Sequence, residues 1–277
     1  MAWALVTPSS RGIGFALTRH LVRTLPPSVP IVATARSDLS GTKEKLLSSL
    51  DVSDEQASRL DVRECNVLSE ASIAELARYC RETYHDGTPR KGEAVQARPH
   101  LRLAFMIPGM LVPEKAPDKV DYESALQTVK MNLIAPMMLV KHFCAFLPRK
   151  SAVVDHHVDG LPRSAVLALM SARVGSIGDN RLGGWYSYRS SKAGLNQLVK
   201  STDIHLKMQS AANAMCVGLH PGTVQTGLSE QFWRSTPREK LFSPEFSAER
   251  LIDVVVNGLE EDGRGKCWDW NGKEIPP

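Results

Sequence analysis

The sequence has few of the features that mark secreted or nucleic-acid-binding proteins. Its five cysteines are odd in number and scattered, without a Cys-x-x-Cys pair, which argues against a disulfide framework and favours a reducing compartment. Basic residues number 34 and acidic residues 30. This excess is too small to indicate nucleic acid or an anionic membrane as a partner. We therefore expect a cytoplasmic protein in which local groups hold any bound anion.

Long hydrophobic runs are also missing. The apolar segment Ala2–Val6 is not accompanied by a basic region or a cleavage signal, as a secretory leader would require. The most apolar later run, Met131–Val140, is interrupted by Asn132 and Pro136, so we expect no membrane span. The 277 residues are 43% hydrophobic and 23% charged, a composition typical of globular proteins.

Short aliphatic segments alternate with longer segments of helical period. The expected strands are Trp3–Thr7, Ile31–Ala35, Leu60–Cys65, Leu101–Ile107, Ala165–Ser171, Ala214–Leu219 and Gly265–Asp269. The expected helices are Gly12–Leu25, Thr42–Leu50, Glu70–Glu82, Tyr122–Phe146, Tyr186–Met208 and Ala248–Leu259. The alternation predicts one doubly wound Rossmann-type α/β domain over residues 1–277, with a seven-stranded parallel sheet covered by helices on both faces.

Three irregular segments interrupt this pattern. Those near 85–100 and 149–164 are rich in turn formers and charge and indicate surface insertions. The segment near 227–246 carries Phe232 and Trp233 among polar residues, which predicts a substrate lid over a pocket. The adjacent histidines in Asp155–Asp159 do not by themselves converge on an ion, so we expect no metal site.

A glycine-containing turn, Thr7–Gly14, lies between the first expected strand and the first helix. Such a turn lets the backbone approach a pyrophosphate, which the amide groups and dipole of the helix N-terminus stabilise. Arg11 lies in this turn and Arg36 follows the second strand, where an acidic residue would bind a ribose 2′-hydroxyl. The planar guanidinium suits a 2′-phosphate instead, so we predict NADP(H) rather than NAD.

Tyr188 and Lys192 lie four residues apart and share one face of an expected helix. A lysine ammonium beside a tyrosine stabilises the phenolate and lowers a pKa that is ordinarily about 10. This pair is therefore suited to acid–base catalysis near neutral pH. Asn132 lies among Met131, Leu133 and Ile134 on another helix, where its amide needs hydrogen-bond partners.

The order of these motifs resembles the short-chain dehydrogenase/reductase family. Thr7, Gly12 and Gly14 match its Thr-Gly-x-x-x-Gly-x-Gly fingerprint, and residues 221–226 match its Pro-Gly-x-Val-x-Thr turn. The run 175–188 and the tail 268–272 look most like the carbonyl-reductase and C-signal branch. The resemblance implies that Tyr188 donates a proton, that Lys192 assists it, and that Asn132 holds a water against the lysine. It also implies cofactor contacts at Thr7, Ser9, Ser10, Arg11, Gly12, Ile13, Gly14, Arg36, Asn66, Val67, Gly109, Tyr188, Lys192, Pro221, Gly222, Val224 and Thr226.

The sequence departs from the family pattern at three strand ends. Pro8 replaces the first glycine and removes an N–H. Met106-Ile107-Pro108 replaces Asn-Asn-Ala, and we expect apolar packing to take over that scaffold role. Ala172 replaces the serine that polarises the substrate carbonyl. We expect Ser171 to take its place as a catalytic residue, with Ser176 as the alternative.

These observations predict an NADPH-dependent oxidoreductase that reduces a ketone or aldehyde of a hydrophobic small molecule to an alcohol. The three departures favour one alternative, a non-redox or regulatory protein that keeps the fold and the cofactor site. We expect a homodimer or homotetramer, with neither nucleic acid nor membrane as a partner.

Overall fold

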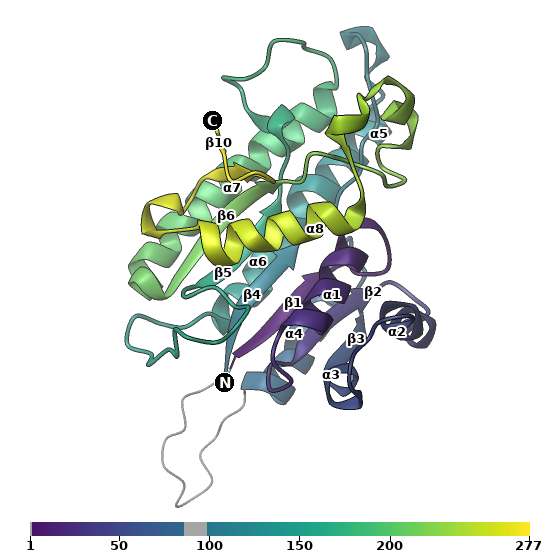
Figure 1. The fold of residues 1–277 in the computed structure, drawn as a ribbon. Helices are drawn as coiled ribbons and strands as arrows, with labels where there is room; N and C mark the ends of the chain where they lie inside the picture. Colours follow the sequence, from purple (N-terminus) through teal and green to yellow (C-terminus); the bar gives the residue numbers. More distant parts are fainter. Residues whose placement is uncertain (1, 86–98) are drawn as a thin grey trace, which may run out of the picture.

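A single mostly parallel sheet forms the centre of the molecule in the computed structural model, which describes residues 2–85 and 99–277 (Figure 1). Its eight strands follow the order β10-β9-β6-β5-β4-β1-β2-β3. The strands are β1 (Ala2–Thr7), β2 (Ile31–Ala35), β3 (Leu60–Glu64), β4 (His100–Met106), β5 (Ala165–Met170), β6 (Ala214–His220), β9 (Cys267–Asp269) and β10 (Glu274–Ile275). The chain reverses its direction of sheet growth between β1 and β4, which is where α/β proteins of this order bind ligands.

The seven predicted parallel strands are confirmed, and an eighth is added. β10 pairs with β9 in the antiparallel direction, and its two residues are too few for a periodic pattern. β9 starts at Cys267 rather than at Gly265, because Gly265 has a φ of +68° and cannot continue an extended strand. Every residue of β5 is buried, as expected for a central strand with helices on both faces.

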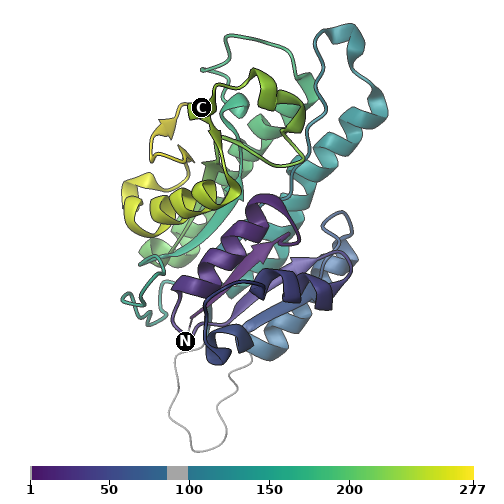
Figure 2. The same cartoon turned by 45° about the vertical axis from the view of Figure 1, so that its right-hand side comes forward.

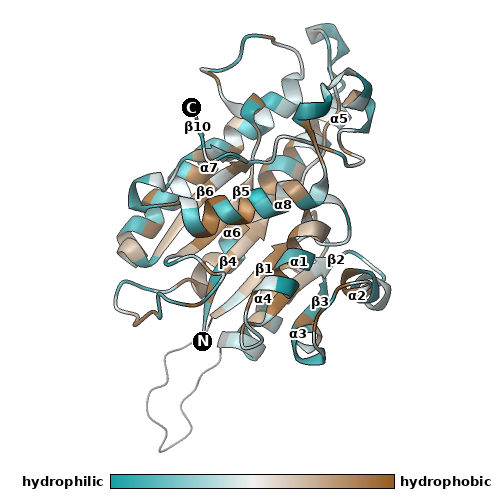
Figure 3. Ribbon diagram, in the orientation of Figure 1, coloured by the Kyte–Doolittle hydropathy of each residue, from teal (hydrophilic) through white to brown (hydrophobic). Residues whose placement is uncertain are grey.

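Helices cover both faces of the sheet. They are α1 (Gly12–Thr24), α2 (Leu39–Leu47), α3 (Asp54–Ser58), α4 (Glu70–Cys80), α5 (Tyr122–Val129), α6 (Ala135–Phe143), α7 (Tyr186–Ser210) and α8 (Pro244–Asp253). Ala4 and Val6 of β1 pack in one core with α1 and α8, while Trp3 and Leu5 pack in a second core with α4, α6 and α7. The apolar sides of the helices accordingly face the sheet (Figure 3).

The predicted helix Tyr122–Phe146 is continuous but not uniform. A π-helical turn, Lys130–Ile134, joins α5 to α6, and a 3₁₀ turn, Cys144–Phe146, ends the segment. By length and apolar composition this helix also meets the criteria for a membrane span, which a helix packed in a protein core can equally meet. Leu139 and Phe143 are fully buried against the sheet.

Two predicted helices start at the wrong residue, and one helix was not predicted. α2 begins at Leu39 rather than Thr42, because the Asp38 side chain accepts a hydrogen bond from Gly41 N and caps the helix. α3 was not predicted, although Ser53 and Gln56 form a capping box that starts it. α8 begins at Pro244, four residues before the predicted start at Ala248, because Ser243 caps the helix.

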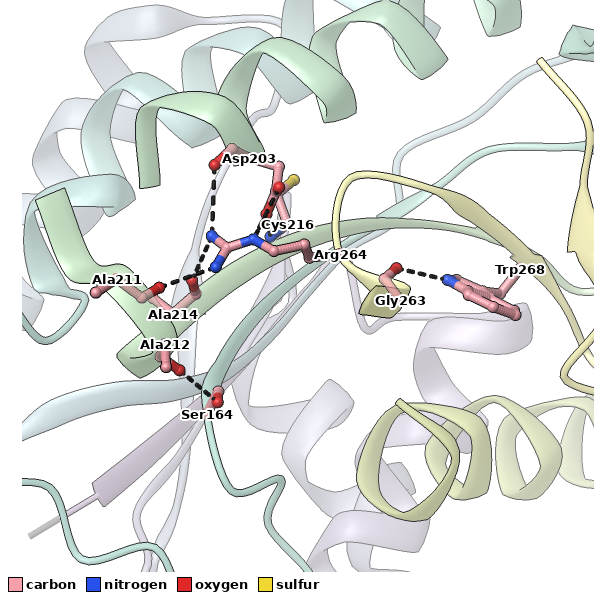
Figure 4. Close-up of polar contacts among 9 residues, drawn as sticks. All are labelled: Ser164, Asp203, Ala211, Ala212, Ala214, Cys216, Gly263, Arg264 and Trp268. Atoms are coloured by element: carbon pink, nitrogen blue, oxygen red, sulfur yellow. Dashed lines mark hydrogen bonds and ion pairs between the residues drawn. The ribbon is translucent and has the colours of Figure 1, made fainter. Parts of the chain in front are cut away.

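A buried ion pair holds the C-terminal end of α7 (Figure 4). Arg264 Nε lies 2.9 Å from Asp203 Oδ2, and its other nitrogens donate to the carbonyls of Ala211 and Ala214 at 2.9 and 3.0 Å. Asp203 Oδ1 also accepts from Cys216 N of β6. A cation at a helix C-terminus complements the helix dipole, so Arg264 fixes α7 against the sheet.

The segments that follow the strands gather at the carboxyl edge of the sheet. The loop 173–185, the segment 225–242 and the start of α5 all lie at this end of the molecule (Figures 1 and 2). A second small sheet, β7 (Thr223–Val224) with β8 (Leu241–Phe242), closes the base of the predicted lid. Of the two predicted insertions, Arg149–Ser164 is an irregular loop tied to β4 through Arg102 Nε, which donates to Pro162 O at 2.8 Å. Residues 86–98 of the other lie outside the described residues.

Candidate active site

Among the described residues, several backbone N–H groups of the turn between β1 and α1 have no hydrogen-bond partner. Gly12 adopts a φ of +58°, and a Cβ on Gly14 would lie 2.0 Å from Pro8 O, so neither position readily accepts a side chain. The Thr7–Pro8 peptide bond is cis. The N-cap of α1, Arg11, makes no side-chain capping bond. The first amide groups of this 13-residue helix are therefore available to an anion.

Thr7 and Ser9, both predicted cofactor contacts, use their side chains to join β1 to β2. Thr34 Oγ1 donates to Thr7 Oγ1 at 2.7 Å, and Ser9 Oγ accepts from Thr34 N at 3.4 Å while it donates to Val6 O at 2.7 Å. Both residues are fully buried. Their hydroxyl groups thus shape the turn, and any cofactor contact they make remains a prediction.

Arg11 and Arg36 lie on neighbouring exposed segments. Ser9 N donates to Thr34 O at 2.7 Å. Arg11 lies two residues after Ser9, and Arg36 lies two residues after Thr34. Within the described residues, neither guanidinium forms a hydrogen bond or an ion pair, and both side chains are exposed. Two unpaired cations beside an uncapped helix N-terminus fit a dinucleotide with an additional phosphate.

Apolar packing replaces the family's asparagines at the end of β4, as predicted. Met106 is fully buried, and Ile107 Cδ1 lies 2.9 Å from where a Cβ on Gly14 would be. At the end of β3, Asn66 Oδ1 accepts from Leu68 N at 3.2 Å, and Val67 is buried. Their predicted place beside the adenine remains a prediction.

Asn132 joins two elements from the π-helical turn. It is fully buried, and its Oδ1 accepts from Met110 N at 2.8 Å. Its Nδ2 donates to Met110 O and to Ser191 Oγ, both at 3.0 Å. The amide that the sequence predicts to need partners is thus satisfied. A π-helical turn is frequent at functional sites, and here it carries the residue that links the β4 loop to α7.

Lys192 lies beside Asn132 and Gly109. Its Nζ donates to Met170 O at 2.6 Å. A Cβ built on Gly109 would lie 3.9 Å from both Lys192 Nζ and Asn132 Oδ1, so three predicted site residues meet at one point. Burial lowers the pKa of Lys192 to about 8.

Tyr188 is buried one turn before Lys192 on α7. The lysine Nζ lies 5.8 Å from the centroid of the tyrosine ring. Burial raises the pKa of Tyr188 to about 12. The expected net lowering of the Tyr188 pKa was therefore wrong, because removal of the phenolate from water outweighs any stabilisation by the ammonium. Within the described residues no hydrogen bond engages the Tyr188 hydroxyl, which leaves it able to donate.

The two candidate serines both have internal partners. Ser171 Oγ donates to Asn196 Oδ1, and Asn196 lies two helical turns beyond Tyr188 on α7. Ser176 Oγ accepts from Asp179 N at 3.0 Å and donates to Pro277 O at 3.3 Å. Ala172, which lies between the two serines in the sequence, is buried. The role of either serine at a substrate carbonyl remains a prediction.

The turn after β6 lies against the phosphate-binding turn. Thr226 Cγ2 would lie 3.3 Å from a Cβ on Gly12. Gly222 has a φ of +77°, and a Cβ there would lie 2.6 Å from the Phe242 ring of the predicted lid. Pro221, Gly222, Val224 and Thr226 therefore lie between the turn and the lid, where the resemblance places the nicotinamide.

Aromatic rings connect the predicted lid to Tyr188. Phe232 lies in a 3₁₀ segment, Glu230–Ser235, with its ring centroid 5.0 Å from that of Trp185. Trp185 in turn contacts Tyr188 edge-on, at 6.0 Å between centroids. Trp233 Nε1 donates to Ser229 Oγ at 2.8 Å.

Sequence reasoning missed Glu114, a buried carboxylate that accepts from Ser187 N at 2.8 Å, next to Tyr188. It lies in an irregular loop without periodicity, and we find no pattern in the sequence that would have identified it.

Known proteins with similar sequences include the C-signal and several oxidoreductases. The chain is 31% identical over 159 residues to the C-signal of Myxococcus xanthus, across 57% of this chain and 81% of that protein. It is 22% identical over 276 residues to a benzil reductase of Bacillus cereus, across 92% and 94% of the two chains. No family profile matches the chain.

Among solved structures, a carbonyl reductase from chicken fatty liver with bound NADPH superposes with a TM-score of 0.77 and 26% identity. The match covers 99% of this chain and 98% of that one. Three findings agree: the sequence identity with the C-signal, the whole-chain superposition, and the grouping of Asn132, Tyr188 and Lys192. The chain belongs to the short-chain dehydrogenase/reductase family, in its carbonyl-reductase branch.

Proposed function

We propose that this protein uses NADPH to reduce a ketone or aldehyde of a hydrophobic small molecule to an alcohol. The observation that carries the proposal is the meeting of Asn132, Lys192 and Gly109 beside Tyr188. A tyrosine proton donor with a lysine nearby can carry out acid–base chemistry on a carbonyl, and these groups lie at the carboxyl edge of the sheet, next to the switch point.

The residues present fit an NADP-type cofactor. The uncapped start of α1 would hold the pyrophosphate, and Arg11 and Arg36 would pair with the 2′-phosphate. When bound, the reduced cofactor supplies the hydride that adds to the carbonyl carbon. The NADPH in the chicken carbonyl reductase supports this choice.

Tyr188 supplies the proton. With a pKa of about 12 its phenol is protonated at neutral pH, and its hydroxyl donates to the carbonyl oxygen as negative charge develops there. Lys192 remains largely an ammonium at that pH, because its pKa is about 8. Its charge stabilises the phenolate left behind, and it returns a proton through a water that Asn132 would hold.

The hydroxyl that holds the carbonyl is assigned to Ser171, with Ser176 as the alternative. For either serine this role requires its hydroxyl to leave an internal partner, Asn196 or Pro277. That exchange costs a hydrogen bond, worth about 1 kcal/mol net, and the new bond to the carbonyl offsets it.

The aromatic surface around Phe232 and Trp185 favours an apolar substrate. The segment near 227–246 is then a lid that excludes water from the carbonyl during the reaction. The benzil reductase relative supports aromatic ketones as first probes. We further propose that the protein is cytoplasmic and forms a homodimer or homotetramer.

The test is NADPH oxidation across a panel of ketones, aldehydes and imines that includes benzil, paired with NADPH and NADH titrations. Turnover of one or more carbonyls, with NADPH bound more tightly than NADH, is the expected result. NADPH binding without any oxidation would favour the non-redox alternative, which the changes at Pro8, Met106–Pro108 and Ala172 motivate. Absence of binding would count against the cofactor itself.

A further inference from the structure

The N-terminus of α7 is capped by a residue from a distant loop. Its N-cap, Trp185, has a φ of +51° and makes no side-chain capping bond, and tryptophan is not a capping residue. Glu114, in the loop after β4, supplies the acceptors instead. Its Oε2 accepts from Ser187 N at 2.8 Å, and its Oε1 accepts from the Ser187 hydroxyl. Its backbone carbonyl accepts from Trp185 N at 2.7 Å.

The cap is buried and charged. Glu114 is 3% exposed, and its carboxylate lies at the positive end of a 25-residue helix. An anion is stabilised at that end by the dipole and by charge-assisted hydrogen bonds. The opposite end of the same helix carries Arg264 on the carbonyl of Ala211. The two charges complement the dipole at both ends and fix the helix along its axis.

Both groups that Glu114 holds are next to the proton donor. Ser187 directly precedes Tyr188, and the Trp185 ring packs edge-on against the Tyr188 ring. Asn132 binds both backbone groups of Met110, four residues before Glu114. The loop from Met110 to Glu114 is thus fixed at one end by Asn132 and at the other by the start of α7.

We propose that Glu114 is a positioning residue for Tyr188. By fixing Ser187 and Trp185, it sets the direction in which the Tyr188 hydroxyl points at the substrate. Displacement of a proton donor by about 1 Å can cost about 100-fold in rate. Since the phosphate turn and Arg36 lie on other elements, loss of Glu114 lowers kcat with a much smaller effect on NADPH affinity. This inference rests on the proposed function, because kcat refers to carbonyl reduction.

The experiment compares Glu114→Ala, Glu114→Gln and a matched control, Asp121→Ala. Asp121 is an exposed carboxylate that caps α5, a different helix from that of Tyr188, through Ser124 N at 2.8 Å. We expect Glu114→Ala to lower kcat about 10- to 100-fold. Glu114→Gln keeps an acceptor for Ser187 N and a partner for its hydroxyl, so kcat stays within about threefold. Asp121→Ala leaves kcat unchanged.

A second measurement does not depend on turnover. The chain has five tyrosines, and ¹³Cζ-tyrosine labelling with Tyr188→Phe as the assignment variant isolates the Tyr188 signal. This signal should shift in Glu114→Ala but not in Asp121→Ala. If Glu114→Ala fails to fold, Ser187→Ala removes one of the two carboxylate bonds and should give the same changes at smaller size.

The two measurements separate the two ideas. An active wild type whose kcat and Tyr188 signal are unchanged in Glu114→Ala, or in Ser187→Ala where the first variant does not fold, would overturn the role of Glu114. A wild type that reduces no carbonyl would count against the proposed function. In that case a shifted Tyr188 signal would still support the positioning role, and an unshifted one would overturn it.

Discussion

The residues of the candidate active site that lie on helices follow the family pattern, while those at the strand ends do not. Asn132, Tyr188 and Lys192 are all present on α7 and on the turn between α5 and α6. At the strand ends, Pro8, Met106–Pro108 and Ala172 replace the usual residues. In the proposed function the helical residues transfer protons or position the groups that do, whereas the strand-end residues chiefly shape the backbone.

This contrast has a physical basis. Asn132 makes three hydrogen bonds that connect the β4 loop to α7, and no apolar side chain could replace them. Ile107 instead fills space on the face of the sheet that α1 covers, and Met106 packs in the core on the opposite face; several apolar residues can perform such a role. A scaffold position can therefore exchange polar bonds for packing, while a proton-transfer position cannot.

The strongest test of this contrast is Tyr188→Phe. Loss of a positioned general acid typically costs about 10²- to 10⁴-fold, so we expect carbonyl reduction to fall by at least about 100-fold. NADPH affinity, measured by fluorescence titration, should be unchanged. Turnover at the wild-type rate would show that another group donates the proton.

Arg36→Ala tests the proposed role of a residue at a strand end, the binding of the 2′-phosphate by Arg36. Because charge-assisted bonds to phosphate contribute about 1.5–3 kcal/mol, its loss should reduce the preference for NADPH over NADH by about 10- to 100-fold. The ratio of the two dissociation constants is the measurement, with Arg23→Ala on the far end of α1 as the control. An unchanged ratio would remove Arg36 from the cofactor site.

Ala172→Ser would sharpen the comparison by restoring a hydroxyl at a strand end. We expect kcat to rise by about tenfold, the size of one added hydrogen bond in the transition state. Ser171→Ala should lower thermal stability, because it breaks the bond to Asn196. If kcat falls further in Ser171→Ala than in Ser176→Ala, Ser171 makes the carbonyl contact. If kcat falls only in Ser176→Ala, Ser176 makes it.

The smallest expected effect concerns stability against pH. Burial lowers the pKa of Lys192 from 10.5 to about 8, so between these values the unfolded chain binds a proton that the folded protein has released. Stability attributable to Lys192 therefore rises from about pH 8 to 10.5. Melting temperatures of wild type and Lys192→Met over this range should diverge in that direction. Parallel curves would contradict a buried, largely neutral lysine at high pH.

Much of the fold could be predicted from the sequence, because seven strands are long enough to show aliphatic runs separated by helical periods. β10 and the β7–β8 pair have two residues per strand, which is too short for any period. The boundary of α2 depends on Asp38, whose left-handed backbone no periodicity reveals. The starts of α3 and α8 could have been predicted from the sequence but were not. Ser53 with Gln56 and Ser243 with Pro244 are capping patterns.

The candidate site was predictable where one motif carries several residues. Tyr188 and Lys192 share a helix, and their proximity follows from spacing alone. The pKa of Tyr188 was not predictable, because burial depends on Trp185 and the rest of the fold. Glu114 was missed for the same reason, since its partner Ser187 lies 73 residues away.

The ion pair between Arg264 and Asp203 also bears on how the molecule opens in solution. Native proteins expose their amides to hydrogen exchange in separate units, of which the most deeply buried open only with global unfolding. Because Arg264 is bound to the carbonyls of Ala211 and Ala214 and Asp203 to Cys216 N, we expect the amides of α7 to belong to the slowest unit. We expect the half-exposed segment Glu230–Ser235 to belong to a faster one. Tyr188 and Lys192 would then lie on a slowly exchanging helix, next to a segment whose amides exchange faster.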